Sequence, residues 1–81
     1  MDETWDECVI VEVSDLDGVQ IVWSPTFAAR LLSENWPKTD GSTYAAALNA
    51  CTDAMLGAAP AAPARDAFLA AIEEVKLKTF R

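Results

Sequence analysis

The sequence predicts an α+β fold in which an N-terminal β-hairpin is followed by three helices, and the C-terminal tail is either a short strand or a helical extension. Three observations lead to this prediction. Apolar residues alternate along 5–13 and 19–23, they recur every three or four positions along 44–75, and turn or capping residues separate these stretches. Alternation places every second side chain on one strand face, whereas the longer spacing gives one helix face. At 81 residues we expect a single domain over 1–81.

The predicted hairpin covers residues 4–23. Its first strand, from Trp5 to Val13, is rich in β-branched residues. Asp17-Gly18 supplies turn chemistry, because glycine tolerates a positive φ. Since apolar residues alternate along both strands, we expect the hairpin to have one apolar face. The residues expected on this face are Val9, Val11, Val13, Val19, Ile21 and Trp23.

The first helix is expected at about 25–35. The Ser24 hydroxyl can accept a hydrogen bond from a first-turn amide, and a proline costs nothing in the next position because its missing N–H has no partner there anyway. Trp36-Pro37 is expected to end the helix, because the residue before a proline is pushed out of the helical region.

The second and third helices are expected at about 43–56 and 63–75. Ser42 or Thr43 can cap the second helix, and Gly57 is expected just past its end. The apolar stripes of the two helices can bury each other across a short bend, so they predict a helical hairpin. The residues in these stripes are Tyr44, Leu48, Cys51 and Met55, followed by Ala64, Phe68, Ala71, Ile72 and Val75.

The tail, 76–81, fits two structures. Val75, Leu77 and Thr79 alternate with Lys76 and Lys78, which indicates a strand, but a continued helix fits the same residues nearly as well. A sheet of only two strands is marginal and leaves its edges unpaired. We therefore expect either that the tail supplies a third strand or that two protomers pair their edges.

Charge is distributed unevenly along the chain. The formal net charge is −7, and the residues before Arg30 include seven acids and no base. Nucleic-acid binding depends on Lys and Arg that displace counterions from phosphates, so this field disfavours a nucleic-acid partner. No apolar run approaches the ~20 residues that span a bilayer. The N-terminus lacks the basic start of a secretory signal. We expect a cytoplasmic protein.

The residue types disfavour catalysis and metal binding. Histidine, the commonest general base and metal ligand at neutral pH, is absent. Cys8 and Cys51 are far apart in the sequence and form no CxxC pair, so we interpret both as small apolar residues. There is no glycine-rich phosphate loop. We expect no catalytic residue, no metal and no cofactor.

Five residues are candidates for binding. Trp5 lies among acids at the start of the chain and is the aromatic residue that we expect to be exposed, and Asp15 and Asp17 lie in the hairpin turn. Trp36 and Arg65 could line a groove between the hairpin and the helices. Arg65 opposes the helix dipole in the first turn of the third helix. We expect it to clamp the carbonyls near Met55 and Leu56, with anion binding as the alternative.

The helical half of the chain also carries a sequence pattern. Its residues are Leu31-Leu32, Trp36-Pro37, Tyr44, Ala47-Leu48, Cys51, Ala54, Gly57, Ala64-Arg65, Phe68 and Ala70-Ala71. This pattern resembles the short bacterial proteins grouped as domain of unknown function 982, and it covers about two thirds of the chain, from Ser24 to Val75. The resemblance implies a short strand pair before the first helix and no particular activity. The acidic front and the lack of a glycine after the third helix depart from the pattern.

Two functions remain open from the sequence. The first is a non-catalytic protein-interaction or regulatory module that uses the acidic hairpin to bind another protein, or a second copy of itself. The alternative is a small-molecule-binding domain with its groove near Trp36 and Arg65. An enzyme is the third and least favoured reading.

Overall fold

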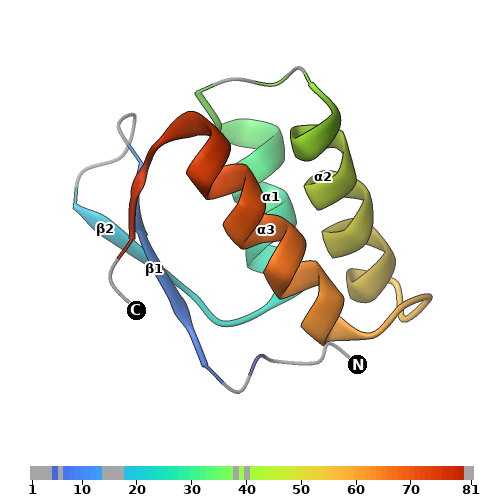
Figure 1. Ribbon diagram of the computed structural model, residues 1–81. Coiled ribbons are helices and arrows are strands. Elements are labelled where there is room, and N and C mark those ends of the chain that lie inside the picture. The colour runs from blue at the N-terminus through green and yellow to red at the C-terminus, as the bar shows by residue number, and fades with distance from the viewer. Residues whose placement is uncertain (1–4, 6, 14–17, 38, 40, 80–81) are drawn as a thin grey trace.

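The described part of the chain forms three strands and three helices, which confirms the α+β prediction (Figure 1). In the computed structural model, the described residues are 5, 7–13, 18–37, 39 and 41–79. The elements are β1 (Val9–Glu12), β2 (Val19–Val22), α1 (Pro25–Glu34), α2 (Ser42–Met55), α3 (Ala61–Val75) and β3 (Lys78–Thr79).

The strands form one antiparallel sheet in the order β2-β1-β3. The tail therefore supplies a third strand, which was one of the two arrangements expected from the sequence. Glu12 of β1 is the register partner of Lys78 of β3, so a base from the tail lies beside an acid of the hairpin. The pairing protects one edge of β1 and leaves β2 as an edge strand.

The helices lie together on one side of the strands (Figure 1). Small residues predominate where α2 and α3 meet, and such residues let two helix backbones approach closely. Burial of these helix faces confirms the predicted helical hairpin, although Tyr44, Leu48 and Met55 of the predicted α2 stripe are only half-buried. Its buried residues are Ala47, Cys51 and Ala54 on α2 and Ala61, Ala64, Phe68, Ala71 and Ile72 on α3.

The first helix begins as predicted, but the second does not. The Ser24 hydroxyl accepts a hydrogen bond from the backbone N–H of Phe27 at 3.3 Å. The prediction that Ser42 or Thr43 caps α2 is wrong, because Gly41 occupies the N-cap with φ 103° and ψ 158°. That conformation favours glycine, so backbone geometry and not a side-chain cap sets the start of α2.

Helices α2 and α3 end in the same way with different residues. After α2, Gly57 has φ +79° and its N–H bonds to the Ala54 carbonyl, while the N–H of Ala58 bonds to the Asp53 carbonyl. These two bonds form a Schellman motif, and they confirm the prediction that α2 ends just before Gly57.

After α3, the N–H groups of Lys76 and Leu77 bond to the carbonyls of Glu73 and Ile72 in the same pattern. Lys76 takes the left-handed position with φ 59°, where glycine is the usual residue. This turn ends the helix and sends the tail back to the sheet, although the glycine expected there is missing.

The apolar face predicted for the hairpin is correct for β1 and wrong for β2. Val9, Val11 and Val13 are fully buried beneath the helices. On β2 the residue that points inward is Val22, which is the register partner of Val9 and is also fully buried. Because side chains alternate along a strand, Val19 and Ile21 then point to the opposite face.

A substitution at Lys76 tests the α3 end. Lys76→Gly removes the steric cost of a left-handed residue with a Cβ atom, so we expect the free energy of unfolding to rise by about 1 kcal/mol in urea titrations. Lys76→Ala is the control, because it removes the charge but keeps the Cβ atom. A Lys76→Gly variant no more stable than Lys76→Ala would contradict the strained turn.

Candidate functional site

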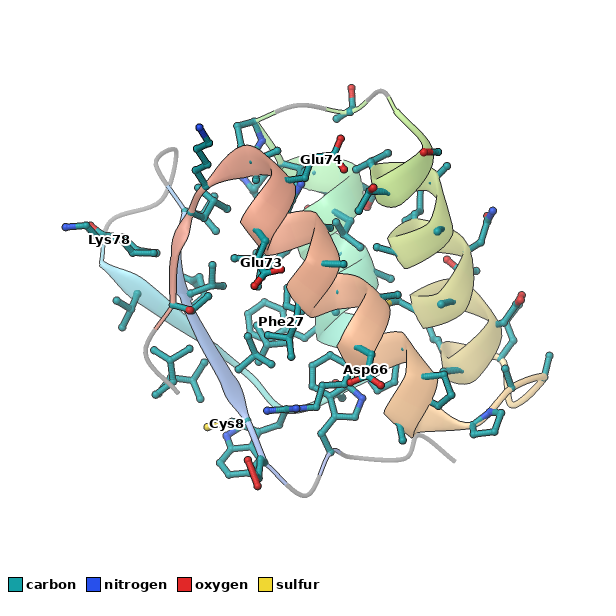
Figure 2. The ribbon with its side chains drawn as sticks, in the orientation of Figure 1. Cys8, Phe27, Asp66, Glu73, Glu74 and Lys78 are labelled. Atoms are coloured by element: carbon teal, nitrogen blue, oxygen red, sulfur yellow. The ribbon has the colours of Figure 1, made fainter. Side chains whose placement is uncertain are left out.

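The candidate site is the face of the sheet turned away from the helices. We call it the outer face. It consists of Cys8, Ile10, Val19, Ile21 and Trp23. Ile10 and Ile21 are register partners, and the alternation that buries Val9 and Val22 puts both isoleucines on this side. Figure 2 shows the side chains of Cys8 and Lys78 pointing away from α3, on the same side of the sheet.

The outer face exposes large apolar side chains. Val19, Ile21 and Trp23 are 46%, 48% and 51% exposed. Leu56, at the bend between α2 and α3, is 71% exposed, but it lies far along the chain from this strand. A single exposed apolar residue such as Leu56 is ordinary, whereas three neighbours on and directly after one strand form a patch of the kind that marks interaction sites.

The pairing of the two strands explains why this patch faces outward. Val9 and Val11 of β1, and Val13 directly after it, are buried against the helices, and Val22 joins that layer by pairing with Val9. The register then fixes the direction of every other β2 side chain, since a slip by one residue would reverse them all. The backbone N–H of Trp5 also bonds to the Trp23 carbonyl at 2.6 Å and holds the end of β2 in place.

Trp5 is not the exposed aromatic residue that we expected. It is 4% exposed, its ring centroid lies 6.0 Å from that of Phe68, and its indole N–H donates to the Ala61 carbonyl at 2.9 Å. The neighbouring acids suggested exposure, but the ring can be buried because a carbonyl at the start of α3 satisfies its one donor. Trp23 is the exposed tryptophan instead.

Trp36 and Arg65, the two predicted groove residues, each have a structural contact of their own. The Trp36 ring is 6% exposed and packs on Phe68 at a centroid distance of 5.6 Å. Its indole N–H has no hydrogen-bond partner among the described residues.

Arg65 contacts the start of the sheet and not the bend between the helices. Its Nε donates to the Glu7 carbonyl at 3.0 Å, and its guanidinium lies 3.8 Å from the Glu7 carboxylate. The expected clamp on the carbonyls of Met55 and Leu56 is therefore wrong. The contact joins α3 to the segment before β1, and these two parts of the chain are far apart in the sequence.

The acidic part of the predicted site is described only in part. Asp15 and Asp17 lie outside the described residues. Glu7 and Glu12 are both exposed, one before β1 and one at its end. Glu12 lies on the same side of the sheet as Ile10, and its register partners are Val19 and Lys78. The outer face is thus an apolar surface with ionic groups at its edge.

The described residues provide little for chemistry. Burial raises the pKa of the Cys51 thiol to about 12, which keeps the thiol protonated at neutral pH and makes it a poor nucleophile. In the described ranges, no three His, Cys, Asp or Glu residues are grouped in a way that could hold a metal ion. Nor does any helix in those ranges have the length and apolar character to cross a bilayer.

A shallow pocket lies between α1 and α2, away from the predicted groove. Its volume is about 270 Å³. Ligand pockets usually measure roughly 300–1,000 Å³ and enclose most of the ligand, so this open hollow is a weak candidate. It is lined by Thr26, Ala29, Arg30, Ser33, Leu48, Thr52 and Met55.

Sequence reasoning missed the outer face although the sequence contains a signal for it. Apolar residues occupy both alternating sets in the hairpin: Ile10 lies between Val9 and Val11, and Val22 lies between Ile21 and Trp23. A hairpin with one buried face needs only one apolar set. The second set is therefore available for a contact outside the domain.

Two matched substitutions test the roles of the buried tryptophans. Trp5→Phe and Trp36→Phe each replace an indole that packs on Phe68 by a smaller phenyl ring, but only Trp5→Phe also removes a hydrogen bond. We expect Trp5→Phe to lower the free energy of unfolding by about 1 kcal/mol more than Trp36→Phe, as measured by urea denaturation. Equal losses, or a larger loss for Trp36→Phe, would contradict the structural role of the Trp5 indole.

A second pair of variants tests Arg65. Arg65→Ala removes the donor to the Glu7 carbonyl, so we expect a loss of about 1 kcal/mol and a lower melting temperature. Glu7→Ala keeps that carbonyl and removes only an exposed carboxylate, so its effect should stay below about 0.5 kcal/mol. An unchanged melting temperature for Arg65→Ala would contradict a structural role for the bond to the Glu7 carbonyl and return Arg65 to the candidates for anion binding.

The comparisons with known proteins agree with the resemblance seen in the sequence. No curated protein and no solved structure matches the chain. A family model described as "Protein of unknown function (DUF982)" matches residues 7–79, which include all of the strands and helices described above. The chain therefore belongs to the DUF982 family.

Proposed function

We propose that this protein is a small non-catalytic interaction or regulatory module of the cytoplasm that binds a partner protein through its outer face. One observation carries the proposal: Val19, Ile21 and Trp23 expose about half of each side chain on a single face of the sheet. Burying such a surface is favourable by roughly 25 cal/mol per Å². A partner that covers these side chains would therefore gain most of its binding energy from them.

The acids of the hairpin would assist this binding. All of the excess negative charge lies before Arg30, in the part of the chain that contains β1 and β2. Exposed charges of one sign raise the association rate of a partner of opposite sign, and salt screens the effect. Asp15 and Asp17, which we predicted as binding residues, are part of this charged segment.

The alternative, a small-molecule site near Trp36 and Arg65, has less support. Trp36 packs against Phe68, and Arg65 is bonded to the Glu7 carbonyl, so both have structural contacts. The pocket between α1 and α2 is shallow and lies elsewhere. We therefore favour the protein-binding role.

Site-specific photo-cross-linking in the source cell tests the proposed face. A benzoylphenylalanine in place of Ile21 should form a covalent adduct with another protein, whereas the same probe in place of Leu56 should not. Position 56 is a matched control because Leu56 is also an exposed apolar residue but lies outside the outer face. No adduct, or equal adducts from both positions, would contradict the proposal.

Binding measurements with the purified partner complete the test. Ile21→Thr keeps a β-branched residue on β2 but removes apolar surface. We expect the Kd of this variant for the partner to rise about tenfold, because residues at the centre of an interface contribute most of the binding energy. Leu56→Ser should leave the Kd unchanged. Neutralising Asp15 and Asp17 together should slow association at low salt and have little effect at high salt.

A further inference from the structure

We propose that the outer face binds a cationic amphipathic helix of the partner protein, which lies across β2 and β1 as an additional layer. This inference rests on the proposed protein-binding function and specifies the partner's structure and charge. The dimensions of the face, its orientation in the sheet, its area and the charge around it each support a helix of this kind.

The dimensions of the outer face match one helix. Along β2, the exposed residues run from Val19 to Trp23, a distance of about 13 Å at roughly 3.3 Å per residue. Across the sheet, Ile10 on β1 widens the surface by one strand spacing of about 4.8 Å. An α-helix is about 10 Å wide with a pitch of about 5.4 Å, so two to three turns would cover the face.

The direction of the exposed side chains favours a helix over an added strand. A strand that paired with the free edge of β2 would lie in the plane of the sheet. The side chains of Val19, Ile21 and Trp23 point out of that plane, so such a strand would leave most of their surface in water. On the opposite face, helices already cover the sheet (Figure 1). A helix on the outer face would create the three-layer arrangement in which both faces of a sheet are buried.

The area of the face suits one helix better than a second copy of this chain. Three side chains that are about half exposed offer on the order of 300 Å² of apolar surface. A stable interface between folded proteins buries about 800 Å² on each partner. Two outer faces stacked on each other would fall well short of that area, and each copy would bring a net charge of −7 to the contact.

Charge selects a cationic helix among amphipathic helices. The first 29 residues, which include β1 and β2, carry seven acids and no base, so this segment of the chain has a strongly negative net charge. Among the described acids of this segment, Glu12 lies beside Lys78 and Glu7 lies 3.8 Å from the Arg65 guanidinium, so two of these charges are offset locally. The acidic net charge of this segment would attract lysine and arginine residues that flank the apolar stripe of a partner helix, while it would repel an acidic helix.

The photo-cross-link from position 21 also tests this inference. Mass spectrometry of the adduct locates the linked segment of the partner, and we expect apolar residues there at three- to four-residue spacing with an excess of Lys and Arg. A synthetic peptide of that segment should gain helical circular dichroism on binding. Its Kd should rise about tenfold with Ile21→Thr, stay unchanged with Leu56→Ser, and rise with added salt.

The outcomes separate the two proposals. Three results would overturn the cationic helix while the outer face remained a binding surface. The adduct from position 21 could map to an acidic segment or to a second copy of this chain, or the peptide of the linked segment could bind without gaining helix. The absence of an adduct specific to position 21 would instead remove the proposed function itself.

Discussion

The packing of Trp5 and Trp36 on Phe68 is the contact on which the rest of the structure depends. Phe68 lies in α3, whereas its two partners come from the segment before β1 and from the loop that follows α1. These three rings join parts of the chain that no turn brings together. A domain of this size buries only about 60–65% of its unfolded surface. Few other side chains could replace this contact.

Much of the fold could be predicted from sequence because short-range signals determine it. Ser24-Pro25 and Gly57 set helix ends, and apolar spacing showed the stripes that join α2 to α3. The errors arose where long-range contacts decide. The direction of β2 depends on the pairing of Val9 with Val22, and alternation alone does not say which of two apolar sets faces inward.

The candidate site was harder to predict, because it consists of the apolar side chains that are not buried in the core. Trp5 was expected in solvent, but the Ala61 carbonyl satisfies its indole and the ring can be buried. Arg65 was expected to bond to carbonyls close in sequence, yet its partner is the Glu7 carbonyl. A backbone carbonyl has no signature in the sequence. Once Trp5 and Trp36 are assigned to the core, Trp23 remains on the surface with Val19 and Ile21 beside it.

The acidic front of the chain explains how an exposed apolar strand can persist. An edge strand such as β2, with no charged residue between Val19 and Val22, would ordinarily favour edge-to-edge aggregation. Seven acids without a base in the same segment of sequence make copies of the chain repel one another. The same field attracts a partner of positive charge. Under our proposal, one distribution of charge would both disfavour contacts between copies of the outer face and favour the cationic partner.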